Sequence, residues 1–334
     1  MESSGVRVDL AVVVPDRLLS WGEGRGALRR AAYYLRATWR SLMIGLRCAF
    51  GASRYDAVLM QRVIFPPPVP RLLRRRRRRI VYDFDDAIFT THDPGEDWAA
   101  RIQTWYHRRG LPAMLASASH TVVENDYTRA YAQAHCPAVS IITGPIDTDR
   151  YSPGAFREAP DPIVLGWIGS TTTERYLDQI RDPLEALSLR HPGLGLLLIG
   201  AQAFEVGAMS VERLDWDLDT EVSALRRIDI GLMPLPDNPW TRGKGGYKLL
   251  QYLSMGIPAV ASPVGINREI VEHGRSGFLA SNDAEWTEYL EALMADPELR
   301  RRMRSAGREK MVAQYSLVQS SRRLREILES VGDR

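Results

Sequence analysis

The sequence predicts an α/β protein made of two doubly wound domains that face a cleft. Short apolar runs alternate with longer amphipathic stretches, this alternation occurs twice, and proline and glycine gather between the two halves at 151–162. Several of the apolar runs are continuous, which is typical of parallel strands buried on both faces. The chain has 334 residues, 45% of them apolar, so each domain can have a core of its own.

Each short apolar run of the first half is expected to form a strand, and the stretches between them have the periodicity of helices. The helices are expected at Gly26–Phe50 and Asp97–Ser117. The strands are expected at Val6–Val14, Ala57–Ile64, Ile80–Phe84, Thr121–Glu124 and Val139–Ile142.

The second half repeats this pattern and then changes to helices alone from Ala284. Helices are expected at Glu174–Arg190 and Tyr247–Met255. The predicted domains are 1–156 and 157–316, and a final helix over 317–334 is expected to pack back on the first domain. The strands are expected at Ile163–Ile168, Gly195–Ile199, Ile228–Met233, Pro258–Ala261 and Gly277–Leu279.

Composition excludes several classes of protein. The longest apolar runs are far shorter than the roughly 18 residues of a membrane span, and no export leader opens the sequence, so we expect a cytoplasmic protein. Cys48 and Cys136 are the only cysteines, which excludes a disulfide framework and a cysteine-based zinc site. The 6 histidines show no metal-ligand spacing.

The net charge of +3 conceals an uneven distribution. Residues 1–156 have a balance of +7, and residues 157–334 have a balance of −4. The run Arg74–Arg79 fits nucleic acid, an anionic membrane surface or simple solvation. Because no aromatic residues are interleaved with the arginines, nucleic acid is not expected, and the sequence favours a membrane-facing patch over solvation.

Lysine is scarce beside 41 arginines, yet two of the 3 lysines, Lys244 and Lys248, lie four positions apart. They belong to a glycine-rich turn with Arg242 that enters a helix ending at Gly256. A helix amino terminus with cations beside it attracts phosphate. The alternative interpretation is a plain loop and a surface helix with solvated charges.

The segment Gly166–Glu174 predicts a strand that runs into a helix. Thr171 and Glu174 have the spacing of a capping box, and the hydroxyls of Ser170 and Thr172 could bind a phosphate. Capping alone would also explain these residues. In a doubly wound domain this segment and the lysine segment both reach the carboxyl edge of the sheet, where ligands bind.

Three acids, Asp83, Asp85 and Asp86, stand at the end of an apolar strand of the first half. Strand alternation places Asp83 and Asp85 on the same side. Such carboxylates could hold a metal, act as a base or bind sugar hydroxyls. They could instead cap the following segment, but acids that end a buried strand are costly without partners, which favours a site.

The sequence resembles the retaining glycosyltransferases of family four, and most closely their bacterial branch that builds capsule, exopolysaccharide and lipopolysaccharide. The resemblance covers about 55–318 and is most specific over 229–280. It rests on Asp229–Pro236, Gly246–Tyr252, Ala261–Val271 and Gly277–Leu279, with Val123–Tyr127 and Pro145–Pro153 similar to the family's interdomain passage. This resemblance implies the GT-B fold, with two Rossmann-like domains, and transfer of a sugar from a nucleotide-diphosphate sugar to an acceptor hydroxyl.

The resemblance also implies roles for individual residues. Lys248 is expected to stabilise the departing pyrophosphate, and Asp85 and Asp86 are expected to orient sugar or acceptor. Gln251 stands where the family has a ribose-binding glutamate, Gly243 stands in place of another glutamate, and Asp85 aligns with the family's catalytic-face histidine. The expected donor-binding residues are Gly169, Ser170, Thr171, Thr172, Arg242, Lys244, Gly246, Tyr247, Lys248, Gln251 and Glu269.

The implied partners are a nucleotide-sugar donor and a lipid-linked or saccharide acceptor, with no metal or other cofactor. The basic first half is expected to contact the inner face of the cell membrane peripherally. Two alternatives stay open: a nucleotide-sugar epimerase of the same fold, and a non-catalytic nucleotide-sugar-binding protein.

Overall fold

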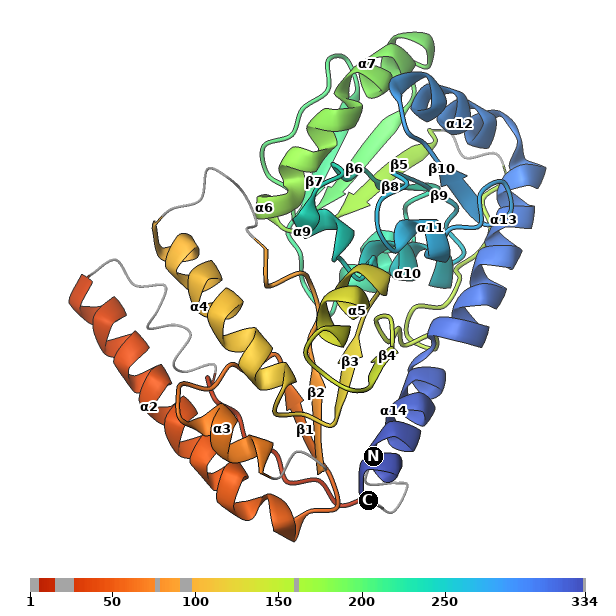
Figure 1. Ribbon diagram of the computed structural model, residues 1–334. Coiled ribbons are helices and arrows are strands. Elements are labelled where there is room, and N and C mark those ends of the chain that lie inside the picture. The colour runs from red at the N-terminus through yellow and green to blue at the C-terminus, as the bar shows by residue number, and fades with distance from the viewer. Residues whose placement is uncertain (1–5, 16–26, 76–78, 91–97, 159–161, 333–334) are drawn as a thin grey trace. The chain divides into compact units, whose positions relative to one another are not determined.

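The structure is a computed structural model that describes residues 6–15, 27–75, 79–90, 98–158 and 162–332 (Figure 1). The chain forms two compact units. Unit 1 comprises Met1–Val123, Arg129–Ser140 and Arg325–Arg334, and unit 2 comprises Glu124–Thr128 and Ile141–Leu324. The two units are described separately below.

Unit 1 contains a four-stranded sheet in the order β1-β2-β3-β4, in which β2 pairs in parallel with both β1 and β3. Because a parallel strand needs a crossover, helices occupy most of the chain between the strands. The strands are β1 (Val58–Gln61), β2 (Ile80–Asp83), β3 (His120–Val123) and β4 (Val139–Ile141), and the helices of this region are α2 (Ala27–Gly51), η2 (Ala52–Arg54), α3 (Val69–Arg74), α4 (Trp98–Leu115) and α5 (Asp126–Gln133).

The prediction of a strand at Val6–Val14 is wrong. Residues 6–13 have no regular secondary structure, and Leu10 is 86% exposed. The carbonyl groups of Val12 and Val13 accept hydrogen bonds from the Arg40 side chain of α2, at 3.2 Å each, instead of from a neighbouring strand. A single apolar run cannot show whether a partner strand is present beside it.

Unit 2 contains a six-stranded parallel sheet in the order β10-β9-β8-β5-β6-β7. The strands are β5 (Val164–Ile168), β6 (Gly195–Ile199), β7 (Ser210–Leu214), β8 (Ile230–Met233), β9 (Ala259–Ala261) and β10 (Gly277–Leu279). The helices are α6 (Thr171–Glu174), η4 (Arg175–Ile180), α7 (Arg181–Arg190), α8 (Glu221–Leu225), α9 (Pro239–Arg242), α10 (Tyr247–Ser254), α11 (Asn267–Ile270), α12 (Asp283–Ala295), α13 (Pro297–Lys310), η5 (Met311–Tyr315) and α14 (Leu317–Gly332).

Both faces of the unit 2 sheet are covered, as the continuous apolar runs predicted. Leu196 and Leu198 of β6 pack with α7 and α12, which lie beside one another in Figure 1. Leu197 and Ile199 point to the opposite face, where they join the cluster that contains α10. The observed alternation confirms the prediction of a doubly wound α/β architecture with parallel sheets.

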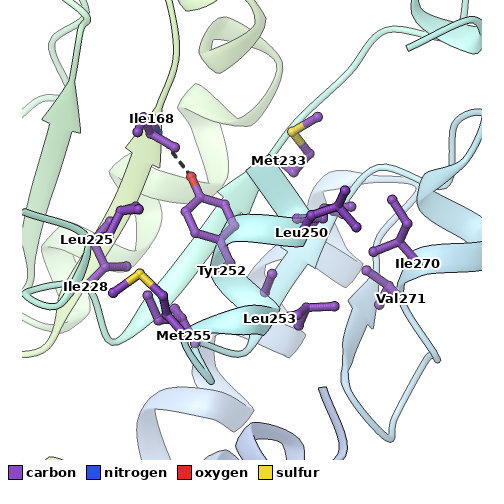
Figure 2. Packing of buried hydrophobic residues seen from close by; sticks show 14 of the residues in the cluster. Ile168, Leu225, Ile228, Met233, Leu250, Tyr252, Leu253, Met255, Ile270 and Val271 are labelled. Carbon is purple, nitrogen blue, oxygen red and sulfur yellow. Dashed lines mark hydrogen bonds between the residues drawn. The ribbon is translucent and has the colours of Figure 1, made fainter. Parts of the chain in front are cut away.

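Tyr252 anchors α10 to the middle of this sheet. Its side chain is fully buried, and its hydroxyl group accepts a hydrogen bond from the Ile168 backbone N–H at 3.1 Å (Figure 2). A Cβ atom at Gly231 would lie 2.5 Å from the Tyr252 ring, so glycine is required for this close packing. The start of α10 is thereby held near the end of β5.

The end of the chain is helical from α12 onward, as expected. Helix α14 runs from unit 2 into unit 1, where Gly332 lies against Asp56. Strand β7 was not predicted, because it lies at the sheet edge and places polar side chains between its apolar ones. Among the described helices, none combines the length and the apolar character that crossing a bilayer would require.

Candidate active site

The two glycine-containing segments of unit 2 meet at the carboxyl edge of its sheet, as predicted. Gly169 follows β5, and a Cβ atom built on it would lie 2.6 Å from Lys248 Nζ and 2.4 Å from the Trp167 ring. The lysine therefore reaches across the end of β5, and Gly169 leaves the space for it. Ligands of doubly wound sheets bind at this edge.

Lys248 contacts an aromatic ring at this edge. Its Nζ atom lies 3.9 Å from the centroid of the Trp167 ring, which is a cation–π contact. Among the residues whose placement is known, no carboxylate pairs with it. Burial, together with the nearby charge of Lys244, lowers the pKa of Lys248 well below its ordinary value. A bound anion would relieve both effects, so this position attracts negative charge.

Lys244 supplies a second positive charge near Lys248. Its Nζ atom lies 5.4 Å from the centroid of the Trp240 ring, and its backbone carbonyl accepts a hydrogen bond from the Asn125 side chain at 3.0 Å. Arg242 is placed differently, because its exposed guanidinium pairs with Asp237 at 2.6 Å and 3.2 Å. A ligand must therefore displace Asp237 to bind Arg242, whereas no described carboxylate forms a salt bridge with Lys244 or Lys248.

The helix amino terminus at α10 lies beside these lysines. Gly246 caps the helix with φ of 69°, a left-handed conformation that favours glycine, and no side chain caps the first turn. The following Tyr247 is 47% exposed. Gly256 ends this helix in the left-handed conformation that the sequence predicted, with φ of 67°.

Ser170 and Thr172 lie next to this edge with exposed side chains, and their hydroxyl oxygens are 2.8 Å apart. Thr171, also exposed, begins α6. The predicted capping box is wrong, because Ser170 is the cap residue and no side chain caps the helix. The buried Glu174 instead accepts hydrogen bonds from the backbone N–H groups of 202–204, and these donors outweigh the effect of burial and lower its pKa.

Gln251 is buried in a polar network that the sequence did not reveal. Its side-chain amide donates to the Tyr151 hydroxyl at 3.5 Å, and Tyr151 donates in turn to Glu221. The other oxygen of Glu221 accepts from the Trp216 indole N–H at 2.5 Å. Neither the burial of Glu221, the first residue of α8, nor strand β7 before Trp216 was predicted, so the sequence carried no signal of this network.

Glu269, the last of the expected donor-binding residues, is on α11. Its side chain is exposed on α11, and its backbone carbonyl accepts a hydrogen bond from Lys310 at 2.5 Å. The structure thus gathers Gly169, Lys244 and Lys248 at one place, leaves Arg242 paired to Asp237, and sets Glu269 beside Lys310.

The acidic cluster of unit 1 stands at the carboxyl ends of β1 and β2. Arg62, directly after β1, pairs with Asp85 at 2.9 Å, and the side chain of Gln61 donates to Asp83 at 3.1 Å. Arg62 and Asp86 have φ values of 49° and 39°, so both adopt left-handed conformations that cost energy for residues other than glycine.

The electrostatics of this cluster are unusual. Burial and then the charge of Asp85 raise the pKa of Asp83 to about 6. Burial also raises the pKa of Asp85, against the lowering effect of Arg62. Asp85 Oδ1 is buried and receives no hydrogen bond from the described part of the chain. Within that same part, no three His, Cys, Asp or Glu side chains are grouped closely enough to hold a metal ion.

Part of unit 2 matches a known protein family. Residues 222–310, which include both lysines, match the family model of the glycosyl transferases group 1. The chain is 24% identical to the α-maltose-1-phosphate synthase of Mycolicibacterium smegmatis, over 73% of each chain.

Two solved structures share the fold of most of the chain. Sucrose-phosphate synthase from Thermosynechococcus elongatus superposes with a TM-score of 0.63 at 14% identity, over 91% of this chain and 79% of that one. Anabaena Alr3699/HepE, solved in complex with UDP, superposes with a TM-score of 0.61 at 17% identity, over 86% of this chain and 82% of that one. The family match over the lysine segment, together with the α/β fold that the chain shares with these structures, indicates a glycosyltransferase.

Proposed function

We propose that this enzyme transfers a sugar from a nucleotide-diphosphate sugar to an acceptor hydroxyl, with retention of the anomeric configuration, in the assembly of a cell-surface polysaccharide or glycolipid. The observation that carries the proposal is Lys248, a partly buried ammonium at the carboxyl edge of the sheet. It lies beside Lys244 and has no counter-ion among the described residues. A diphosphate supplies the negative charge that this position lacks.

The donor is proposed to bind along this edge of unit 2. Its diphosphate would contact the two lysines and the uncapped backbone N–H groups at the start of α10, and the hydroxyls of Ser170 and Thr172 would donate to its oxygens. The complexes of Alr3699/HepE with UDP and with UDP-glucose, which share the fold, support a nucleotide-sugar donor.

The reaction breaks the bond between the anomeric carbon and the diphosphate oxygen and forms a bond to the acceptor oxygen. The acceptor's proton passes to the departing diphosphate, which lies on the face that the acceptor attacks when configuration is retained. Negative charge grows on the diphosphate as the bond breaks, so preorganised cations at Lys248 and Lys244 stabilise the transition state more than the bound donor. Asp85 and Asp86 are proposed to hold the acceptor or sugar hydroxyls from unit 1.

Helix α2 supports peripheral contact of unit 1 with an anionic membrane. Its sequence contains five arginines and no acid. Leu35, Trp39 and Phe50 are exposed by 76%, 62% and 72%, and they share one side of the helix, adjoining the line of Arg36 and Arg47. Apolar and aromatic side chains beside arginines suit the interface of an anionic bilayer, where a lipid-linked acceptor would be found.

A transfer assay with purified protein tests the proposal. UDP-, GDP- and ADP-sugars are offered with a panel of saccharide and lipid-linked acceptors, nucleotide release is measured, and NMR of the product establishes the anomeric configuration. We expect transfer with retention and a loss of about 100-fold or more in kcat for Lys248→Ala. Arg190→Ala, which removes an exposed charge of α7, is the control and is expected to retain activity.

Three results would contradict the proposal. Inversion at the anomeric carbon would exclude the retaining reaction. Conversion of the donor without any acceptor would indicate an epimerase or hydrolase. Donor binding without turnover across the acceptor panel would indicate a binding protein.

A further inference from the structure

Trp216 stands at the same sheet edge as the lysine pair. It follows β7, and 53% of the residue is exposed. Gly200 follows β6 with φ of 81°, and a Cβ atom built on it would lie 2.1 Å from the Gly169 carbonyl oxygen and 3.4 Å from Trp216 Cβ. Gly169 therefore lies next to Lys248 and next to Gly200, and Gly200 in turn lies next to Trp216. A ligand that binds at Lys248 and extends across Gly169 reaches the indole.

The indole is held at its polar edge by buried groups. Its N–H donates to Glu221, which is 4% exposed and also accepts a hydrogen bond from Tyr151. The loop beneath is ordered as well, because Asp217 Oδ1 accepts from the backbone N–H groups of Asp219 and Thr220 at 2.9 Å and 3.2 Å. The hydrogen-bonding capacity of the indole is thus satisfied by the protein, while much of its ring surface stays exposed.

A single exposed apolar side chain is ordinary on a protein surface. Trp216 differs because a buried carboxylate fixes its orientation, and burying an acid for a surface side chain is costly unless the orientation matters. The same network continues through Tyr151 to Gln251, which lies on α10 within one turn of Lys248. The indole and the lysine helix are consequently connected by one chain of hydrogen bonds.

We propose that Trp216 is the platform on which the nucleobase of the donor stacks. The inference rests on the proposed nucleotide-sugar donor and names the residue that binds its base. Every nucleobase has an aromatic face, so stacking on Trp216 adds affinity for the nucleotide without selecting one base. Glu221 and Tyr151 act as positioning residues, because they hold the indole and touch no part of the nucleotide.

The test compares ligands with and without a base. Calorimetry measures the binding of UDP, ADP, GDP and inorganic pyrophosphate to the full-length protein and to Trp216→Phe, Trp216→Leu and Lys248→Ala. Trp216→Phe retains an aromatic face and loses the N–H, whereas Trp216→Leu retains bulk and loses the face. We expect Trp216→Leu to weaken all three nucleotides by about tenfold or more and to leave pyrophosphate binding unchanged. Trp216→Phe should bind nucleotides within a few-fold of the wild type.

Fluorescence provides a second readout of the same contact. Nucleotides should quench tryptophan emission in the wild type beyond the change that pyrophosphate causes, and Trp216→Phe should lose that additional quenching while it still binds UDP. Far-UV circular dichroism and the melting temperature of each variant establish that it is folded.

The possible failures are distinct. If Trp216→Leu binds UDP as tightly as the wild type while Lys248→Ala does not, the base does not stack on Trp216 and the proposed donor stands. If Trp216→Leu weakens the binding of UDP and of pyrophosphate equally, the substitution disturbs the whole carboxyl edge of the sheet, and the stacking role is overturned. If the wild type binds none of the nucleotides, the proposed function fails and this inference fails with it.

Discussion

Lys248 Nζ lies 3.9 Å from the centroid of the Trp167 ring, although the two residues belong to different elements of unit 2, α10 and β5. Trp167 is 1% exposed, so the lysine lies over an apolar surface, and no carboxylate of the described segments pairs with it. A cation held in this way is unfavourable for folding and favourable for binding a diphosphate. Removal of this charge should therefore stabilise the fold and weaken diphosphate binding.

Lys248→Met is expected to raise the free energy of unfolding by about 1 kcal/mol while abolishing transfer, because it replaces a desolvated charge by an apolar chain. The folded-state pKa of Lys248 lies below the unfolded value, so between the two the unfolded chain binds more protons and the wild type gains stability as pH rises. The stability of Lys248→Met should not show this increase with pH. Urea unfolding at several pH values measures both effects.

Lys310→Met is the matched control for this substitution. Lys310 pairs with Glu272 at 3.1 Å, so its removal should lower stability rather than raise it. Destabilisation by Lys248→Met of similar size would contradict the interpretation of Lys248 as an uncompensated cation.

Gly169→Ala tests the close approach at the end of β5. The added methyl group would lie 2.6 Å from Lys248 Nζ and 2.4 Å from the buried Trp167 ring, so the lysine must move and the strand end must shift. We expect a stability loss of about 1–3 kcal/mol and weaker binding of pyrophosphate by calorimetry. Gly195→Ala at the start of β6, where the nearest atom is 3.7 Å away, should leave pyrophosphate binding unchanged.

Asp83 should give unit 1 a stability that depends on pH. Its folded-state pKa of about 6 exceeds the ordinary value of 3.8, so the folded state binds the proton more tightly and this contribution falls as pH rises from about 4 to about 6. Asp83→Asn should remove that slope and be more stable at pH 7 by on the order of 1 kcal/mol, since the group is only partly buried. Thermal unfolding of both proteins between pH 4 and pH 8 measures this dependence. If the stability of Asp83→Asn changes with pH as steeply as that of the wild type, the prediction is wrong.

Gln251→Glu would restore the acid that the related glycosyltransferases are expected to have, but in a buried network that already contains Glu221. The second carboxylate should lower stability by about 1–3 kcal/mol at pH 8 and less at pH 5, where it is protonated. Gln314→Glu, at an exposed position, is the control. Calorimetric melting at the two pH values would show equal shifts if the network tolerates a second charge.

Trp39→Glu should reduce binding of the protein to anionic vesicles by about tenfold or more at physiological salt, because it places a charge among the exposed apolar side chains of α2. Leu189→Glu introduces the same charge at a residue that is 76% exposed on α7, and it should have little effect. Vesicle co-sedimentation measures the bound fraction. A wild type that fails to sediment with anionic vesicles would exclude the membrane contact.

The parallel sheets could be predicted because a strand buried on both faces must be apolar throughout. Gly195–Ile199 and Gly277–Leu279 were predicted with their observed bounds, and the helix at Tyr247 was predicted to within one residue. Edge strands do not carry that signal, which is why β7 was missed. The apolar run at Val6–Val14 shows the converse error, since apolar character alone does not provide a neighbouring strand.

Local sequence was also a poor guide to capping. Thr171 and Glu174 have capping-box spacing, yet Glu174 binds backbone N–H groups of the loop after β6. The spacing describes what two side chains of one turn can reach, and it carries no information about donors that folding brings closer from elsewhere.

By itself, the sequence determined most of the buried parallel strands, the glycines of the sheet edge, and the two lysines that stand out against 41 arginines. Those features depend on local periodicity and on residue identity. Only the tertiary structure decided that Lys248 lies over the Trp167 ring, that Arg242 is already paired, and that Gln251 is linked through Tyr151 and Glu221 to Trp216. The pKa of a group and the fate of a hydrogen bond depend on neighbours distant in the chain, and folding alone determines which neighbours those are.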